Sequence, residues 1–485
     1  MPLKSLPALV ALLAVVLGGY LALAPGSHQV LLSLLSPKPL VLTKPPTSPS
    51  PPLHLDESKE ALSDFQNWLK SKGASFRRCK LITYGEIDEH RGIHAKKKGI
   101  KKGEVIMDIP DKIIIPNFVA ASSDICAKMK KLLPDVYSLD NSHLFLSLFL
   151  IEQRDLGESS EWYHYISTLP EKYENLPINF TPAEIELLQE SNLREDMYSS
   201  YKDMIHEDYD TLCGAIPEFC STHSFETYSW ARASVLTRAF SLEIDGVPTS
   251  TLIPFGDMLN HDPNPALYWT YNSTTKSAQF ISTRDIEGNA PILSSYGLIG
   301  SRYSLSHYGF AIQDNPLETA LVELALPQDE FLRHRCAKAL GHGALFSSVM
   351  HHVQAKRDDE EFLALLGVAR ISVSSPMGLG GMATGGKKYV SMWNEWKALD
   401  YLEDAVVKGL SKFPHSVESD EALLRYNNTV LSLNTRNIVI VRLGEKRVLI
   451  QLRELIGEMK FSIQVKLAAY VLTTVGSLGV WFLLG

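Results

Sequence analysis

The segment 251–310 constrains the fold most, because two short apolar runs in it each end in polar or aromatic residues. Residues 252–255 (Leu-Ile-Pro-Phe) lead into residues 257–263 (Asp-Met-Leu-Asn-His-Asp-Pro), which hydrogen-bond locally and end regular structure. Residues 292–295 (Ile-Leu-Ser-Ser) are a second, β-prone run that ends in a Tyr-Gly turn. We therefore expect polar side chains at a strand or helix end, with the phenol of Tyr296 at the mouth of a pocket.

The order of these residues resembles that of the SET-domain methyltransferases, in particular the branch that includes the Rubisco large-subunit lysine methyltransferases. In that branch an Asp-x-x-Asn-His segment precedes a Tyr-Gly and then a Tyr-Gly-Phe, as residues 257–261, 296–297 and 308–310 do here. Each piece alone is typical of an ordinary turn or strand end, whereas their joint order is specific. The resemblance implies a cofactor site in this part of the chain.

The resemblance extends upstream of this segment. Residues 91–95, 100–104 and 107–110 resemble the opening β-hairpins of the family, and Gly92 and Gly103 suit the turns between them. The implied fold class is α+β, with a SET-domain β-fold of short strands.

The expected domains follow from the same resemblance. Residues 56–312 would form the SET domain, with a helical insertion at about 120–230. Residues 313–460 are expected to be a mostly α-helical domain, because apolar residues recur in them at helical spacing. This part resembles the C-terminal substrate-binding domain of the branch, which would dock a folded protein substrate. A purely structural helical cap fits the periodicity equally well.

The resemblance implies direct transfer of a methyl group from S-adenosylmethionine (SAM) to a nitrogen, without a metal. Tyr296 matches the active-site tyrosine, whose hydroxyl helps to orient the attacking amine. Arg238 would meet the cofactor carboxylate, Asn260 its amino-acid portion and His261, mainly through its backbone, the adenine. The full set of implied cofactor-binding residues is Glu89, His90, Arg91, Gly92, Arg238, Asp257, Asn260, His261, Tyr308 and Phe310.

The acceptor side chain is indicated by two residues that we assign to the substrate channel, Phe240 and Gly256. Histidine-methylating members of the branch carry an asparagine and a tryptophan at these positions, and lysine-specific members carry a small residue at the second. Gly256 therefore favours lysine over histidine. An attacking lysine must be neutral although its free pKa is about 10.4, so the channel must favour deprotonation.

The chain departs from the family pattern after Tyr296. The family usually has Gly-x-x-Ser-Asn-x-Glu, whereas residues 297–303 read Gly-Leu-Ile-Gly-Ser-Arg-Tyr, so Ser301 replaces the asparagine and Tyr303 the acid. Serine caps a helix about as well as asparagine, and neither change removes a group that performs chemistry. The changes leave open an alternative, a catalytically silent SET-like scaffold at a membrane, although such a scaffold would not need the retained site residues.

Composition narrows the other possibilities. A chain of 485 residues, 45% hydrophobic and 21% charged, can form two or three domains with sizeable cores. The net charge of −8 gives no indication of nucleic-acid binding, and the lysines at 96–98 and 101–102 are expected to lie on a solvated face. The Gly-rich segment 381–388 lacks the Ser or Thr of a P-loop, so a plain loop is favoured. The five cysteines, at irregular spacing, are expected to be reduced thiols: Cys79, Cys126, Cys213, Cys220 and Cys336.

Both ends of the chain predict hydrophobic helices. Residues 6–24 are an apolar run of 19 residues, close to the length that spans a bilayer. We favour an uncleaved anchor (1–24) over a cleaved signal peptide, followed by an extended Pro-rich linker (25–55). A second apolar run within 461–485 fits a tail anchor or a buried terminal helix. Basic residues on the enzyme side of both runs predict membrane association with the catalytic domain in the cytosol.

Overall fold

The computed structural model describes residues 58–84, 91–133, 142–188, 191, 193, 200–339, 347–374, 391–426 and 431–484. Several sequence predictions fall outside these residues: the N-terminal anchor (1–24), the Pro-rich linker (25–55), Glu89, His90 and the Gly-rich segment 381–388.

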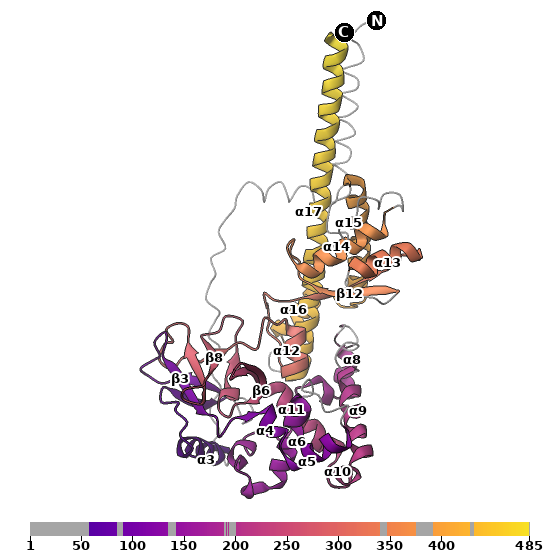
Figure 1. The fold of residues 1–485 in the computed structure, drawn as a ribbon. Helices are drawn as coiled ribbons and strands as arrows, with labels where there is room; N and C mark the ends of the chain where they lie inside the picture. The colour runs from indigo at the N-terminus through magenta and orange to yellow at the C-terminus, as the bar shows by residue number, and fades with distance from the viewer. Residues whose placement is uncertain are drawn as a thin grey trace. The chain divides into compact units, whose positions relative to one another are not determined.

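The first part of the described chain is built on short strands that pair into small sheets (Figure 1). The pairings are β1 (Cys79–Thr83) with β2 (Arg91–Ala95); β3 (Val105–Pro110) and β8 (Leu267–Asn272) on either side of β9 (Ser277–Ser282); β4 (Ile115–Pro116) and β5 (Ala239–Ile244) on either side of β6 (Val247–Leu252); and β7 (Asn260–His261) with β10 (Leu293–Ser294). All are antiparallel except β7–β10, which is parallel. The central strand β9 is buried along almost its whole length, as expected for a strand covered on both faces.

Helices fill the chain between β4 and β5. They are α4 (Asn117–Ala120), α5 (Asp124–Leu132), α6 (Ser142–Asp155), α7 (Tyr163–Ile166), α8 (Pro182–Leu188), α9 (Ser200–Ala215), α10 (Pro217–Thr222) and α11 (Phe225–Arg238), preceded by α3 (Ser58–Ser71) before β1, with short 3₁₀ turns at Gly157–Ser159 and Pro177–Asn179. Helix α11 starts where the Ser224 hydroxyl accepts the Thr227 N–H, a standard N-cap. It ends directly at β5, so its last residue, Arg238, lies at the edge of the sheet.

The C-terminal part is mostly helical, as predicted, but it also contains an antiparallel hairpin that the helical periodicity did not indicate. Its strands are β11 (Ala320–Ala325) and β12 (Ser348–Val353), and its helices are α13 (Glu330–Ala339), α14 (Glu360–Ser372), α15 (Met392–Ser411), α16 (Val417–Tyr426) and α17 (Leu433–Leu484). Between the two parts lies α12 (Ser301–Tyr308). Helix α17, yellow in Figure 1, packs against α15, α16 and β11 and also against α8 and α12. The α+β class is therefore confirmed.

The hairpin prediction is right for one glycine and wrong for the other. Gly103 lies in the turn before β3 with φ of +84°, which glycine adopts readily. Gly92 lies inside β2, not in a turn. A Cβ at Gly92 would lie 2.7 Å from the Asn260 amide nitrogen and 2.9 Å from the Tyr84 hydroxyl. Glycine is therefore needed there for close packing.

The prediction of five reduced thiols is wrong for two cysteines. Cys213 at the end of α9 and Cys220 in α10 form a disulfide. Their separation of seven residues across a helix–helix turn brings the two Cα atoms to 5.4 Å, within the range that a disulfide bridges. Cys79, Cys126 and Cys336 are free and buried.

The predicted terminal membrane helices find no support in the described part of the chain. Among its helices, none is both long enough and apolar enough to cross a bilayer. The apolar run after residue 467 forms the end of α17.

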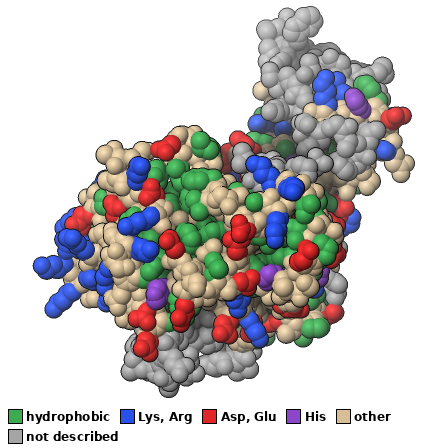
Figure 2. Space-filling view, turned by 60° about the horizontal axis from the view of Figure 1, so that its bottom comes forward, with side chains coloured by type: hydrophobic (Ala, Val, Ile, Leu, Met, Phe, Trp, Pro, Cys, Tyr) green, Lys and Arg blue, Asp and Glu red, His purple; other side chains and the backbone are tan. Residues whose placement is uncertain are grey.

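Charged side chains of both signs are mixed on the face drawn in Figure 2, with Lys and Arg side chains gathered toward one edge. The lysines at 96–98 and 101–102 are exposed, as predicted. Asp285 binds Lys101 through an ion pair of 2.7 Å and accepts the Lys102 backbone N–H, so part of this basic run is neutralised locally.

Candidate active site

A pocket of about 700 Å³ lies where β7, β10, α11 and α12 come together. Its walls carry most of the residues that the sequence assigned to the cofactor. The lining residues are Tyr84, Arg91, Pro170, Lys172, Tyr173, Glu174, Asn175, Glu184, Thr237, Arg238, Asp257, Met258, Asn260, His261, Tyr296, Tyr308, Gly309, Phe310, Ser432, Leu433 and Asn434.

The β7–β10 pairing explains why two separate motifs meet in this pocket. Asn260 is in register with Leu293, and His261 with Ser294. The Tyr296 backbone N–H then donates to His261 Nδ1 at 2.9 Å, which holds the imidazole beside the tyrosine. The parallel pair thus converts two strand ends into one wall of the pocket.

The Tyr296 phenol donates a hydrogen bond to the backbone carbonyl of Leu259 at 2.6 Å. Burial raises the pKa of this phenol above its ordinary range, and the nearby Arg238 only partly opposes the shift. Tyr296 is therefore protonated at neutral pH. Because its hydrogen is committed to Leu259, its oxygen is left as an acceptor on the pocket side.

Arg238 is held by a buried carboxylate. Its Nη1 lies 3.4 Å from Asp257 Oδ2 and 3.3 Å from the Asp257 carbonyl oxygen. Tyr165 donates to the same Oδ2 at 2.9 Å. Burial raises the pKa of Asp257, whereas Arg238 and the Tyr165 hydrogen bond favour its ionised form. Asp257 therefore orients Arg238. The sequence had indicated only that Asp257 contacts the cofactor.

Arg91 lies close to this pair and completes the basic side of the pocket. Its guanidinium donates to the Thr168 carbonyl. Burial and the neighbouring Arg238 lower the pKa of Arg91 to about 10, so it is still charged at neutral pH. Two guanidinium groups therefore face a single buried carboxylate, which leaves the pocket suited to an added anionic group.

Two buried polar atoms of the pocket lining have no hydrogen-bond partner among the described residues: Asp257 Oδ1 and His261 Nε2. Burial lowers the pKa of His261, so the ring is neutral. Since its Nδ1 accepts the Tyr296 N–H, its Nε2 carries the proton and is a donor. Asn260 donates to the Arg91 carbonyl at 3.2 Å, and its amide oxygen accepts no hydrogen bond from the residues that the structure describes. A polar ligand with both donors and acceptors would complete this set, which is the fit expected for SAM.

Aromatic rings close the other side of the pocket. Tyr296 and Tyr308 have ring centroids 4.7 Å apart, and Phe310 lies 6.0 Å from the His261 ring. Tyr308 and Phe310 flank Gly309, which ends α12 in the left-handed conformation with φ of +77°. A Cβ at Gly309 would lie 2.2 Å from the Asn175 amide nitrogen, so glycine is required for this helix end.

The residues after Tyr296 that depart from the family pattern still form helix α12. Ser301 is the first helical residue and not the predicted cap, because Gly300 occupies the N-cap position without a side-chain hydrogen bond. The Ser301 hydroxyl donates to the Ile312 carbonyl, and Glu318 accepts the Ser301 backbone N–H. The ring of Tyr303 stacks on His307.

The two residues assigned to the substrate channel do not line this pocket. Phe240 packs edge-on against Trp269 and Phe280. Gly256 is buried in a 3₁₀ turn (Gly256–Met258), and a Cβ there would lie 2.5 Å from the Phe280 ring. Their positions fit internal packing beside the pocket.

Several lining residues were not predicted. Pro170 and residues 172–175 come from the helical insertion, and residues 432–434 come from the start of α17 and the residue before it. Asn434 donates to the Glu174 carbonyl at 3.0 Å and joins the two segments. No local pattern could have found them, because these segments lie 260 residues apart along the chain and meet only in the folded structure.

Comparison with known proteins agrees with this geometry. Residues 90–297 match the SET domain family model, and residues 329–449 match the Rubisco LSMT substrate-binding family model. By this match, residues 90–297, which hold most of the pocket, are those of a SET domain. More particularly, the chain carries a SET domain followed by a Rubisco LSMT substrate-binding domain.

Curated proteins with similar sequences include actin-histidine N-methyltransferases. That of Papio anubis is 25% identical over 412 residues and that of Rhinolophus ferrumequinum 26%. Each match covers 80% of this chain and 66% of the relative, so the chain spans slightly less than two thirds of the length of these relatives.

Solved structures share the fold. A crystal structure of the SET domain of LSMT bound to lysine and AdoHcy has a TM-score of 0.67 and 20% identity, over 84% of this chain and 92% of that chain. The structure of Rubisco LSMT bound to AdoMet has a TM-score of 0.66 and 19% identity, over 83% and 93%.

Proposed function

We propose that this protein is a SAM-dependent protein methyltransferase. The observation that carries the proposal is the β7–β10 junction, which brings Tyr296, Asn260 and His261 into one pocket with Arg238. The family matches and the cofactors named for the solved neighbours support it.

The donors and acceptors of the pocket suggest how SAM would be held. Arg238, oriented by Asp257, would bind the carboxylate of its amino-acid portion. Asn260 and the orphaned Asp257 Oδ1 would accept hydrogen bonds from its ammonium group. The rings of Tyr308 and Phe310 would cover its apolar surface. Bound there, SAM supplies a methyl group on a sulfonium that a nitrogen nucleophile can take up.

Tyr296 would act by orientation. Its phenol is protonated and already donates to Leu259, so it cannot remove a proton from the substrate. Its oxygen can accept a hydrogen bond from the attacking amine and so align the nitrogen lone pair with the methyl group. The acceptor must arrive neutral, and burial of the site favours that state.

We propose lysine as the methylated residue, with histidine as the second candidate. The glycine at position 256, packed on Phe280, has no space for the tryptophan of the histidine-methylating pattern, and Phe240 stands where that pattern has asparagine. Histidine is favoured by the sequence relatives, which are actin-histidine N-methyltransferases. The two observations point in opposite directions, so the choice requires measurement.

The test is methyl transfer from radiolabelled SAM into protein extract by the full-length chain, beside its Tyr296→Phe variant. Label on lysine that is lost in the variant would support the first candidate, and label on histidine the second. If no label is transferred, titration with SAM decides: binding leaves a missing substrate as the cause, whereas no binding contradicts the cofactor site.

For localisation, we propose membrane association through residues 6–24, with the catalytic part in the cytosol; this rests on sequence alone. The Cys213–Cys220 disulfide removes part of its support, since disulfides are rare in the cytosol. Protease digestion of intact organelles is the test. Protection of the SET domain would contradict a cytosolic orientation.

A further inference from the structure

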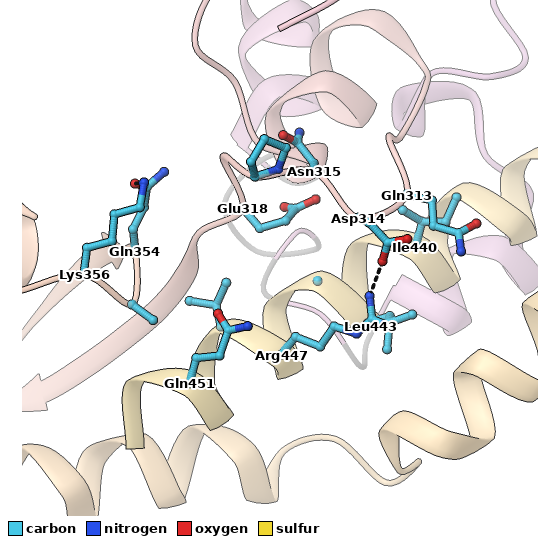
Figure 3. Close-up of a pocket in the computed structure, with 14 residues that line it drawn as sticks. Gln313, Asp314, Asn315, Glu318, Gln354, Lys356, Ile440, Leu443, Arg447 and Gln451 are labelled. Atoms are coloured by element: carbon cyan, nitrogen blue, oxygen red, sulfur yellow. Dashed lines mark hydrogen bonds and ion pairs between the residues drawn. The ribbon is translucent and has the colours of Figure 1, made fainter. Parts of the chain in front are cut away.

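A second pocket, of about 310 Å³, lies between the segment that follows α12, the loop that follows β12, and one side of α17 (Figure 3). It shares no lining residue with the candidate active site. In Figure 3, Gln354 and Lys356 come from the side opposite to Gln313 and Asp314. Its size is at the lower end of ligand sites, which suits one side chain better than a whole cofactor.

Glu318 is the central acidic group of this pocket. Its Oε2 accepts the Ser301 backbone N–H at 3.0 Å. Helix α17 approaches the carboxyl group closely at Gly444, where a Cβ would lie 2.9 Å from Glu318 Cδ. No ion pair to Glu318 occurs among the residues that the structure describes. Burial raises the pKa of Glu318 to about 7, and the hydrogen bonds from Ser301 oppose the shift.

The other charged groups around the pocket have partners of their own. Arg447 forms ion pairs with Asp314 and, at 2.7 Å, with Glu421. Lys356 is exposed and donates to the Gln354 side chain at 2.8 Å. Glu318 is therefore the one lining carboxylate that lacks a cation in the described structure.

The remaining walls suit an aliphatic stem. Ile440, Leu443 and Val448 present apolar surface from α17, and Ala355 does so from the loop. Gln313 and Gln451 place amide groups, which can accept hydrogen bonds, at the rim. An acidic group beyond an apolar wall matches a side chain that carries its charge at the end of a methylene chain.

We propose that this pocket binds the side chain of an arginine or lysine presented by a partner protein, with Glu318 as the anionic partner. A guanidinium or ammonium would donate to Oε1 of Glu318, while the stem packs against Leu443 and Val448. The pocket residues of the loop after β12, and those on α17 other than Gln451, fall within the segment that matches the substrate-binding family model. The identification of the partner as the methyl-accepting protein rests on the proposed function. The binding of a cationic side chain in this pocket does not depend on it.

Because Glu318 must lose its proton to bind a cation, the affinity of the pocket for a cation should depend on pH. Glu318 must be ionised to pair with a cation, so affinity rises as the pH rises from 6 to 8, through the pKa of about 7. At pH 6, binding releases protons. The neighbouring charged groups, Asp314, Arg447 and Lys356, are already paired or exposed and are not expected to reproduce this pH dependence.

The experiment is isothermal titration of the full-length protein with a capped pentapeptide that has one central arginine among glycines. Matched peptides carry lysine, or citrulline, which keeps the shape of arginine without its charge. The cationic peptides are expected to bind and the citrulline peptide at least tenfold more weakly. Because binding at pH 6 releases protons to the buffer, the binding enthalpy measured at pH 6 should differ between buffers that have different heats of ionisation. No saturable binding of the cationic peptides up to about 10 mM would overturn the proposal.

Two variants test the assignment to Glu318. Glu318→Gln keeps an oxygen to accept the Ser301 N–H but has no charge, and it should lose at least tenfold in affinity along with the proton release. Asp358→Asn is the matched control, because Asp358 is an exposed carboxylate just beyond the pocket loop. Equal loss in both variants, or none in Glu318→Gln, would contradict the assignment. If Glu318→Gln does not fold, the citrulline comparison still decides.

A small free cation tests whether the pocket binds a protein side chain or a small molecule. Butylguanidinium has the same charge and stem but no peptide backbone. The proposal expects it to bind more weakly than the arginine peptide. Equal affinity would mean that the pocket takes a small molecule and not a protein side chain.

These measurements do not involve methyl transfer. Binding without activity would contradict the proposed function and leave this pocket assignment standing. Activity without binding would do the reverse.

Discussion

Tyr165 and Asp257 lie 92 residues apart in the chain, yet the Tyr165 hydroxyl donates a buried hydrogen bond of 2.9 Å to Asp257 Oδ2. The bond joins the helical insertion to the segment that precedes β7. It also stabilises the ionised carboxyl that orients Arg238, so one phenol supports both the fold and the basic side of the pocket.

Tyr165→Phe should therefore lower the free energy of unfolding by about 1.5–3 kcal/mol, the range for a hydrogen bond to a charged group. Urea denaturation measures this. It should also weaken SAM binding, because Arg238 loses part of its support. Tyr163→Phe, at a half-buried position in the same helix, serves as the control. Unchanged stability would mean that the bond contributes nothing.

Tyr296→Phe should leave SAM affinity nearly intact and lower turnover at least tenfold, about 1.4 kcal/mol of transition-state stabilisation. The reason is that the variant keeps the ring that packs on Tyr308 but loses the hydroxyl bound to Leu259. Single-turnover kinetics and SAM titration separate the two effects. Tyr303→Phe, on the exposed side of α12, should behave as wild type. Wild-type turnover in Tyr296→Phe would remove Tyr296 from the catalytic role.

Asn260→Ala should weaken SAM binding by about tenfold or more, equivalent to about 1.4 kcal/mol. The amide reaches across β2 at Gly92 and lines the pocket. Equilibrium dialysis with labelled SAM measures the change. Asn264→Ala, in the exposed turn after β7, is the matched control. Normal SAM affinity in Asn260→Ala would contradict the site assignment.

Gly256→Ala should destabilise the protein by about 1–3 kcal/mol, because the new Cβ would lie 2.5 Å from the Phe280 ring in a packed core. Thermal unfolding measures the loss. Gly214→Ala is the control: it lies in α9 with nothing within 4 Å of its Cβ, so alanine there should be neutral or stabilising. If Gly256→Ala is as stable as wild type, the position has space for larger residues, and the argument for lysine weakens.

Glu318→Gln should change how stability depends on pH. The folded pKa of about 7 exceeds the ordinary value of 4.5, so between these values the unfolded chain ionises Glu318 while the folded chain keeps its proton. Protonated Glu318 therefore stabilises the folded wild-type protein fully below pH 4.5, and this stabilisation is lost as the pH rises through 7. The upper limit of the loss is on the order of 3 kcal/mol, from 2.5 pKa units. Urea denaturation at pH 5 and pH 8 should therefore show the variant gaining on wild type at pH 8. A constant difference would show that Glu318 has an ordinary pKa.

The sequence predicted those parts of the site that are local. Residues 257–261 and Tyr296 were recognisable because their order along the chain resembles that of a known family, and the structure brings both motifs into one pocket. Their meeting depends on the parallel β7–β10 pair, which has only two residues in each strand and no periodic signal. The family resemblance, and not the strand pattern, supplied that contact.

Other features depend on contacts that no local pattern encodes. Gly92 was placed in a turn because glycine favours turns, yet it serves the close approach of Asn260 within a strand. The disulfide was missed because seven-residue spacing becomes informative only once α9 and α10 are known to turn back on each other. Phe240 and Gly256 were assigned to the substrate channel from the family resemblance alone; the structure adds that both pack on Phe280 and that neither lines the cofactor pocket.

Helix α17 contributes Leu433 and Asn434 to the candidate active site and, further along, Leu443, Gly444 and Arg447 to the second pocket. At a rise of 1.5 Å per residue, the two contact points are about 15–20 Å apart on one continuous rod. Any tilt or slide of that rod shifts a wall of both cavities at once. Occupants of the two cavities would then influence each other's affinity by the same factor in either direction, as thermodynamic linkage requires.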